Sequence, residues 1–314
     1  MRVLVTGGAG FIGSNLVRAC LERGDEVRVL DDFSTGRSEN LAELQGAIDL
    51  VKGSIVDFET VQRSMSGCAV VYHLAALPSV VQSIEEPVRT HAVNVSGTVH
   101  VLEASRREGV RRVVYASSCA IYGDSRALPH REDLPPLPLS PYALHKLTGE
   151  LYCQQFTRLY GLETLVLRYF NVFGPCQDPS SLYAAVIPRF MNAVTRGESP
   201  CVYGDGLQSR DFVHVADAVA ATRAASSAPP ESVGQIINVG RGDAVTVVDL
   251  LDEVCKAARR EAVAPVFEPA RSGEVRHSQA DITKAGRLLG WRPRLTLAEG
   301  LQGTLRAFGS EAMA

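Results

Sequence analysis

The 314-residue chain lacks the features that would place it in a membrane or on a nucleic acid. No stretch of about 18 uncharged apolar residues occurs, so no membrane-spanning helix is expected. The formal net charge is −3 and no long basic run is present, which argues against a surface that tracks nucleic-acid phosphates. The chain also has no internal repeat and no low-complexity segment, and its length suits one large or two modest domains.

The seven cysteines lack the spacing of a metal site or of paired disulfides. We interpret them as small, buried, apolar residues of a reduced protein. The first expected strand begins at the N-terminus, which leaves no room for a signal peptide. These absences predict a cytoplasmic protein without a metal ion.

A glycine-rich turn near the N-terminus is the most informative feature that is present. An apolar run at residues 3–5 leads into Gly7, Gly10 and Gly13, and a helical pattern covers residues 11–23. In this context the first glycine permits the turn, the second admits a pyrophosphate, and the third lets helix and strand pack closely. Free N–H groups at the start of the helix would face the phosphates. The spacing therefore predicts a dinucleotide site.

Two acidic residues favour one dinucleotide over another. Asp31 and Asp32 end the second apolar strand, about 20 residues beyond the glycines, where a carboxylate can hold the hydroxyls of the adenosine ribose. Neither position carries an arginine that could receive a 2′-phosphate, and Arg37 lies later in the loop. We therefore expect NAD rather than NADP.

Strand and helix patterns alternate through the first half of the chain. We expect strands at residues 2–6, 26–30, 49–52, 69–74, 112–117 and 163–169, and helices at residues 11–23, 57–66, 86–108 and 142–160. Such alternation, with nearly continuous apolar strands, predicts a Rossmann-like, doubly wound α/β fold whose parallel sheet is buried on both faces. Ligands should then bind beyond the carboxyl ends of the strands.

The pattern changes after about residue 171, where loops lengthen and strands become sparse. We expect helices near residues 183–196, 246–260 and 296–308, short strands at Tyr203 and Phe267, and a return to the first sheet at residues 211–224 and 235–239. This divides the chain into a domain of residues 1–170, which residues 211–240 rejoin, and a smaller α/β domain of residues 171–314. The proline-rich run 129–141 reads as a stiff loop, either a connector or a lip beside the site.

Tyr142 and Lys146 form the second decisive pattern. They follow a proline that suits the first helical turn, and their spacing of four places them on one helix face. An ammonium near a tyrosine stabilises the phenolate and lowers its pKa, so Tyr142 could act as a base near neutral pH. Ser118, at a strand end, could relay a proton or hold a substrate hydroxyl, whereas Ser117 is expected to cap the next turn.

These segments resemble the extended short-chain dehydrogenase/reductase superfamily. The resemblance rests on residues 6–13, Ser117-Ser118 with Tyr122-Gly123, the segment 142–146, and Arg168-Tyr169-Phe170-Asn171. Segments 173–179, 185–188, 209–212 and 271–278 resemble, within that superfamily, the 4-epimerases that act on UDP-glucose and UDP-N-acetylglucosamine.

The resemblance implies a reaction. Tyr142 would take the proton of the sugar 4-hydroxyl while C4 gives hydride to NAD, Lys146 would hold the nicotinamide ribose, and Ser118 would support the proton transfer. The 4-keto sugar would turn over and take the hydride back on its other face, so NAD would stay bound.

The implied sites comprise two sets of residues. The NAD site would contain Gly7, Gly10, Phe11, Ile12, Gly13, Asp31, Asp32, Ser34, Thr35, Gly36, Ser54, Ile55, Leu74, Ala75, Ala76, Asn94, Ser117, Tyr142, Lys146 and Tyr169. The UDP-sugar site would contain Ser79, Ser118, Tyr142, Asn171, Ala185, Val186, Tyr203, Arg210, Arg271, Glu274 and Ser278. Arg210 and Arg271 would clamp the diphosphate, since a guanidinium donates in pairs, and Tyr203 would stack on uracil or serve as a core aromatic.

Two positions bear on the reaction and the substrate. Related dehydratases and decarboxylases carry an acid just after the Ser118 position, whereas Cys119 and Ala120 stand here, which favours epimerisation. Ser278 replaces a bulky tyrosine of related epimerases, which implies that N-acetylated as well as plain hexoses are accepted.

Other hypotheses remain open. The main competitor is a UDP-glucuronic acid 4-epimerase or a 4-ketoreductase, for which Arg189, Arg276 or His277 could offer a polar site to the carboxylate. An NAD-sensing protein without activity is a third. The resemblance further suggests a homodimer that uses the helices at residues 86–108 and 142–160.

Overall fold

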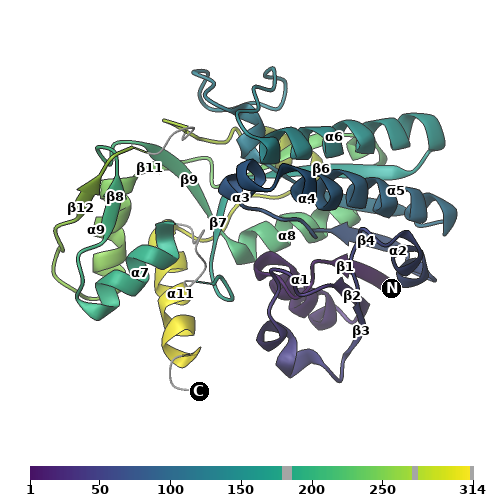
Figure 1. Ribbon diagram of the computed structural model, residues 1–314, viewed down its shortest axis with the longest axis horizontal. Coiled ribbons are helices and arrows are strands. Elements are labelled where there is room, and N and C mark those ends of the chain that lie inside the picture. Colours follow the sequence, from purple (N-terminus) through teal and green to yellow (C-terminus); the bar gives the residue numbers. More distant parts are fainter. Residues whose placement is uncertain (179–185, 271–274, 312–314) are drawn as a thin grey trace.

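The computed structural model describes residues 1–178, 186–270 and 275–311 (Figure 1). Ala185, Arg271 and Glu274 lie outside these ranges. No helix within them is long and apolar enough to cross a membrane.

The described residues contain a seven-stranded, parallel sheet in the order β10-β6-β5-β4-β1-β2-β3. Its strands are β1 (Arg2–Thr6), β2 (Glu26–Asp31), β3 (Ile48–Lys52), β4 (Val70–His73), β5 (Arg112–Ser118), β6 (Glu163–Tyr169) and β10 (Ile236–Val239). The order reverses between β1 and β4, and this switch point is where open α/β sheets bind their ligands. The expected Rossmann-like fold is confirmed.

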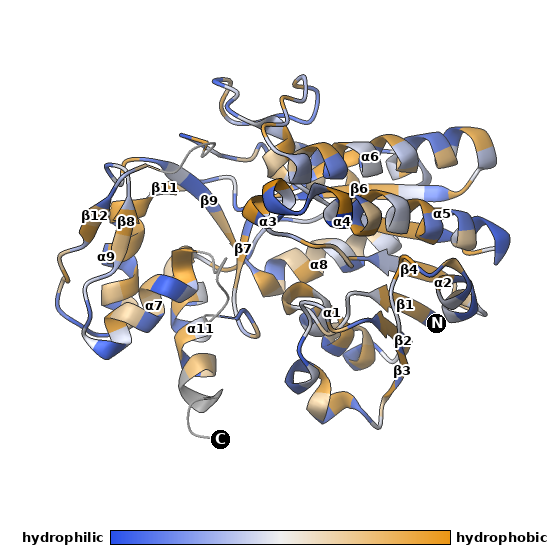
Figure 2. Cartoon of the chain, in the orientation of Figure 1, coloured by the Kyte–Doolittle hydropathy of each residue, from blue (hydrophilic) through white to orange (hydrophobic). Residues whose placement is uncertain are grey.

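Helices cover both faces of this sheet. One face carries α1 (Phe11–Glu22), α8 (Val215–Ser226) and α10 (Thr283–Leu289), and the other carries α2 (Phe58–Met65), α5 (Gly97–Arg107) and α6 (Pro141–Tyr160). Val3 and Val5 of β1 belong to the first hydrophobic core and Leu4 to the second, as the alternation of side chains along a strand requires. In Figure 2 much of the central sheet accordingly has the hydrophobic colours.

The helix expected at residues 86–108 is interrupted. It consists of α4 (Pro87–His91), a π-helical segment (Ala92–Ser96) and α5, and a further helix, α3 (Val80–Glu85), precedes it. Asn94 lies in the widened turn, where its side chain accepts a hydrogen bond from the Leu77 N–H at 2.8 Å and donates to the Leu77 carbonyl at 3.0 Å. The irregular turn thus ties the helix to the chain that leaves β4.

The remaining elements build a smaller lobe around a separate core. Its strands are β7 (Asn171–Phe173), β9 (Ser209–His214) and β11 (Ala244–Thr246) in one sheet, and β8 (Cys201–Tyr203) and β12 (Val266–Glu268) in another; its helices are α7 (Val186–Arg196), α9 (Val247–Ala257) and α11 (Leu297–Glu311). Residues 236–239 rejoin the large sheet as expected. Residues 211–214 do not, because β9 pairs with β7 and β11, and only the following helix α8 returns.

Candidate active site

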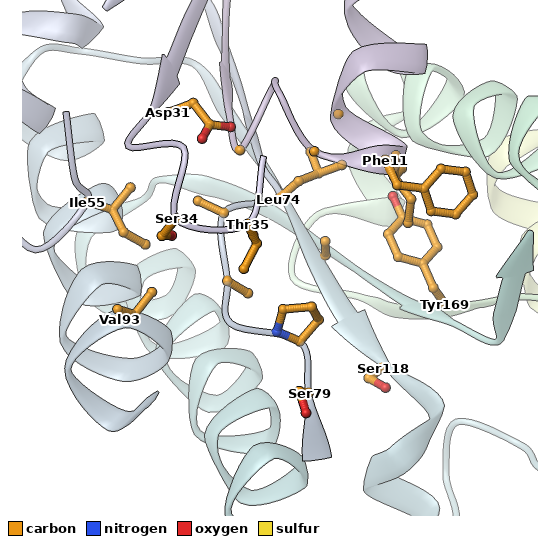
Figure 3. Close-up of a pocket in the computed structure, with 18 of the residues that line it drawn as sticks. Phe11, Asp31, Ser34, Thr35, Ile55, Leu74, Ser79, Val93, Ser118 and Tyr169 are labelled. Atoms are coloured by element: carbon orange, nitrogen blue, oxygen red, sulfur yellow. The ribbon is translucent and has the colours of Figure 1, made fainter. Parts of the chain in front are cut away.

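A cavity of about 490 Å³ opens beyond the carboxyl ends of β1, β2, β4 and β5 (Figure 3). Its volume falls within the range of small-molecule sites. Its position matches the reversal of strand order between β1 and β4. The described residues include no cluster of three or more side chains that could hold a metal ion.

The glycine-rich turn forms one wall and fits a dinucleotide. Gly7 has φ +71°, and a Cβ there would lie 2.7 Å from the Ala75 nitrogen. A Cβ at Gly13 would lie 2.0 Å from the Gly7 carbonyl oxygen, so only glycine lets α1 approach β1 this closely. Gly10 precedes α1 without a side-chain cap, which leaves N–H groups of the first turn available to a phosphate.

The two neighbouring acids divide their tasks. Asp31 is buried and accepts hydrogen bonds from the N–H groups of Ala9 and Phe33, both at 2.8 Å, so it braces the glycine-rich turn. Burial raises the pKa of Asp31. Burial also opposes ionisation of Asp32, but hydrogen bonds from Ser34 and Ser54 outweigh it and lower the pKa of Asp32. Both acids line the cavity, and Asp32 carries the more stable negative charge toward it.

The structure gathers most of the expected NAD residues around this cavity. Lining residues are Gly7, Gly10, Phe11, Ile12, Gly13, Asp31, Asp32, Ser34, Thr35, Ile55, Leu74, Ala75, Ala76, Ser117, Tyr142, Lys146 and Tyr169. Three others lie behind the lining: a Cβ at Gly36 would touch the Asp31 carboxylate, Ser54 bonds Asp32, and Asn94 bonds Leu77.

Further lining residues were not expected from the sequence. They are Leu30, Gly53, Pro78, Gln82, Val93, Ala116, Phe170, Val172, Gln177 and Asp178. Most of them are apolar or come from loops, so neither residue type nor spacing identifies them in the sequence as residues of a binding site. Gln177 and Asp178 were noticed only as part of a family resemblance, and the fold brings their loop over the start of α1, where the Asn15 amide donates to the Pro175 carbonyl at 3.0 Å.

The catalytic candidates meet at the cavity from β5 and α6. Helix α6 begins at Pro141, as predicted, and Ser140 caps it by accepting from the Ala143 N–H at 3.2 Å. Ser118 ends β5, and its hydroxyl is near enough to the phenol of Tyr142 to lower the pKa of that phenol. Lys146 lies one turn further along α6 and donates to the Ala116 carbonyl at 2.7 Å.

We expected the Tyr142 pKa to be lowered. This prediction is wrong when the groups of the protein alone are considered. Burial raises the pKa of Tyr142 to about 12, and the nearby Ser118 hydroxyl offsets this only in part. The Lys146 ammonium lies 6.0 Å from the centroid of the Tyr142 ring and bonds a carbonyl instead. Burial lowers the pKa of Lys146 itself to about 8, against the opposing charge of Glu150.

Ser118 lies beside Tyr142 as predicted, but it also takes the capping role that was expected of Ser117. Ser118 caps the next turn, because its hydroxyl accepts from the Ala120 N–H at 3.2 Å. Ser117 does not; its hydroxyl donates to Glu150 Oε1 at 2.6 Å. Glu150 in turn accepts two bonds from Arg168, at 2.8 and 2.7 Å, and both partners are buried. Ser117 is thereby fixed to a buried ion pair behind the cavity.

Ser79 is the one expected sugar-site residue, apart from Ser118 and Tyr142, that the structure places on this cavity within its described part. It caps α3 by accepting from the Gln82 N–H at 3.0 Å.

The other expected sugar-site residues lie in the smaller lobe. The Asn171 amide donates to the Asp211 carbonyl at 3.1 Å, and Arg210 donates to the Ser209 carbonyl at 2.9 Å. Tyr203 lies under the guanidinium of Arg189, with 5.3 Å between the guanidinium carbon and the ring centroid.

Two more of these residues stand at element ends or beside the catalytic strand. Val186 begins α7. Ser278 is buried, and its N–H donates to the Ser209 carbonyl at 3.1 Å. Ser278 also lies near enough to the Cys119 thiol to lower its pKa, which places Ser278 beside the turn that follows β5.

Comparisons with known proteins place these features in a family. The sequence model of the "NAD dependent epimerase/dehydratase family" matches residues 3–240. A UDP-glucose 4-epimerase of Mycolicibacterium smegmatis is 41% identical over 316 residues, covering 99% of this chain and 100% of that protein.

Solved structures agree with this result. A UDP-glucose 4-epimerase of Thermotoga maritima, crystallised with UDP-glucose, has a TM-score of 0.94 at 39% identity, covering 99% of this chain and 100% of its own. A UDP-glucuronic acid 4-epimerase of Bacillus cereus, in complex with UDP-glucuronic acid and NAD, has a TM-score of 0.91 at 29% identity, covering 99% and 100%.

The fold and the site thus define an extended short-chain dehydrogenase/reductase whose cofactor is NAD. More specifically, the chain belongs to the NAD dependent epimerase/dehydratase family. It is an epimerase, and its relatives differ in the nucleotide sugar that they bind or act on.

Proposed function

We propose that the protein interconverts UDP-hexoses at C4, accepting UDP-glucose and UDP-galactose and also their N-acetylated counterparts. The observation that carries this proposal is that Ser118 and Tyr142 meet at the cavity, near enough for the Ser118 hydroxyl to lower the Tyr142 pKa, while Cys119 and Ala120 follow Ser118 in the chain. Cys119 follows Ser118, and burial raises its pKa to about 11, so its thiol stays protonated near neutral pH. Ala120 has no titratable group. The proton transfers of an elimination or a decarboxylation therefore lack a dedicated group at this point.

The residues at the cavity suit the two proton transfers of an epimerisation. Tyr142 would take the proton of the 4-hydroxyl and return it after the sugar has turned. Since burial raises its pKa to about 12, its phenolate would have to be favoured by the positive charges of Lys146 and bound NAD. Ser118 can donate to that phenolate and accept from the sugar, because a hydroxyl does both. Lys146, on α6, would hold the nicotinamide ribose and place a positive charge beside it. Bound NAD would supply the hydride acceptor and donor for C4.

The room for the substrate is argued from Ser278. This residue is buried beside Cys119, which follows the catalytic Ser118 in the chain. A serine there takes up less space than the tyrosine of related epimerases, and we infer that this room admits an N-acetyl group. Ser278→Tyr is expected to abolish turnover of the N-acetylated sugar and spare the plain one.

The competing glucuronate reaction receives less support from the smaller lobe. Arg276 donates two hydrogen bonds to Asp205, at 2.7 and 2.8 Å, and His277 bonds the Ser209 hydroxyl at 2.9 Å. Arg189 lies over Tyr203. Each of the three side chains considered for a substrate carboxylate is therefore engaged with a neighbour.

Proton NMR of the purified protein tests the proposal, with UDP-glucose in one tube, UDP-N-acetylglucosamine in another and no added cofactor. New anomeric signals of the galacto-configured products are expected in both tubes, and Tyr142→Phe should abolish them. Product in the plain-sugar tube alone would refute the Ser278 argument but keep the reaction. Conversion of UDP-glucuronic acid alone would move the assignment to the competitor.

We also propose that the protein acts as a cytoplasmic homodimer. Exposed apolar side chains gather on α3, α4 and α6, among them Ile84, Val88, Leu144 and Leu151. Val88 is 83% exposed, which an isolated chain would not favour for so large an apolar group. All seven cysteines are free, as expected in a reducing compartment. Sedimentation showing a monomer at micromolar concentration would contradict the dimer.

A further inference from the structure

Lys146 rests on the face of a buried aromatic ring. Tyr115 precedes Ser118 by three residues on β5 and is 1% exposed. The Lys146 ammonium lies 5.1 Å from the centroid of the Tyr115 ring, closer than to the ring of Tyr142. Within the described residues the ammonium donates one hydrogen bond, to the Ala116 carbonyl. The backbone and the ring of β5 therefore form the floor beneath this cation.

The ring matters because the ammonium has few other partners. A lysine ammonium carries three donors, and burial away from water favours its neutral form. The Glu150 carboxylate of the same helix favours the charged form of Lys146, but it does not hydrogen-bond the ammonium, and it accepts two hydrogen bonds from Arg168. The electron-rich face of an aromatic ring attracts a cation, and the attraction grows when water is excluded.

The position of the Tyr115 ring is fixed from several sides. A Cβ at Gly149, on α6, would lie 2.3 Å from the Tyr115 hydroxyl, so this glycine makes room for the tyrosine inside a helix. The ring of His73, on β4, lies 5.5 Å from the Tyr115 ring, centroid to centroid. Three other titratable groups interact with Lys146. Burial keeps the Cys153 thiol of α6 protonated by raising its pKa, and burial together with the Lys146 charge lowers the pKa values of His73 and His145.

We propose that Tyr115 is a positioning residue that holds the Lys146 ammonium charged and in place through the face of its ring. The Tyr115 hydroxyl does not contribute to this effect, since the Lys146 ammonium lies over the face of the ring. The importance of this for turnover rests on the proposed function, because that function assigns Lys146 to the nicotinamide ribose. The state of Lys146 itself can be measured without turnover.

The chain offers a direct measurement, because it has only four lysines: Lys52, Lys146, Lys256 and Lys284. Lysine labelled with ¹³C at Cε gives four NMR signals from the NAD-loaded protein, and Lys146→Arg assigns the one of interest. Burial lowers the pKa of Lys146 to about 8, so its signal titrates in an accessible range.

Two substitutions separate the ring from the hydroxyl. Tyr115→Phe keeps the ring and should leave the titration of Lys146 unchanged. Tyr115→Leu removes the π face and should lower the pKa of Lys146 by about one unit, which corresponds to the loss of a desolvated cation–π contact. The pH profile of kcat should shift in the leucine variant and not in the phenylalanine variant.

An unchanged Lys146 titration in the leucine variant would overturn the proposal, as would equal shifts in both variants. If Tyr115→Leu does not fold, pentafluorophenylalanine at position 115 keeps the shape of the ring while reversing its charge distribution, and it should lower the pKa as leucine does. A shifted Lys146 pKa in a protein that epimerises no UDP-hexose would refute the proposed function and leave this inference standing.

Discussion

The large-sheet region and the smaller lobe position their expected functional residues in different ways. In the first, side chains from β1, β2, β4, β5 and α6 meet at one cavity, because parallel strands end at the same edge of the sheet. In the second, strands β7, β8, β11 and β12 are three residues long and belong to two separate sheets. In the first region, a residue's place at a strand end is enough to predict that it meets the other functional residues. In the second region, contacts between segments far apart in the sequence decide which residues meet.

Each region also buries one carboxylate completely and stabilises it differently. Glu150 forms a buried salt bridge with Arg168 behind the catalytic residues. Asp211 in β9 accepts three backbone N–H groups, from Arg241 at 2.6 Å, Gly242 at 2.9 Å and Ala280 at 3.1 Å. Burial outweighs these bonds and raises the pKa of Asp211 to about 6.

The largest effect should come from the glycine-rich turn. Gly13→Ala places a methyl group 2.0 Å from the Gly7 carbonyl, where the backbone of β1 and α1 cannot move apart without opening the cavity. We expect loss of bound NAD and destabilisation of more than about 4 kcal/mol. Gly303→Ala on α11 is the matched control, because a Cβ there meets nothing within 4 Å. Retained NAD absorbance in Gly13→Ala would show that the turn tolerates a side chain.

Breaking the buried ion pair should rank next. Arg168→Met leaves Glu150 buried without its partner, which is expected to cost about 3–5 kcal/mol in chemical denaturation. Arg276→Met removes the pair with Asp205 in the smaller lobe, where both side chains are about half exposed, and should change stability little. Equal losses in the two variants would contradict the distinction between the regions.

The pH dependence of stability should separate the two carboxylates. The folded-state pKa of Asp211 lies above its unfolded value, so the native state binds more protons between about pH 4 and 6. The contribution of Asp211 to stability is therefore greatest below that range and falls by up to about 3 kcal/mol as the pH rises through 6. The difference in unfolding free energy between wild type and Asp211→Asn, measured across this range, should show that slope.

The smallest effect should come from a single hydrogen bond of the lobe. Asn171→Ala removes the bond from its amide to the Asp211 carbonyl and should cost about 1 kcal/mol. If Asn171 also contacts the substrate, the KM for UDP-glucose should rise while kcat changes little. An unchanged KM with reduced stability would restrict Asn171 to joining β7 and β9.

The sequence predicted the features that depend on neighbours along the chain. The spacing of Gly7, Gly10 and Gly13 defines the turn, apolar runs define the strands of the large sheet, and Pro141 marks the start of α6. These follow from local sterics and from the burial of alternating side chains, so the sequence alone determined the fold class and the sheet edge at which the candidate cavity lies.

Tertiary structure decided how chemically similar neighbours divide their roles. Asp31 braces the glycine-rich turn while Asp32 faces the cavity with its two serines, and Ser117 turns to Glu150 while Ser118 turns to Tyr142. In each pair the residues are identical and adjacent, so no sequence pattern distinguishes them. Their roles depend on which groups the packed helices and strands bring within hydrogen-bonding distance, and on how much water that packing excludes.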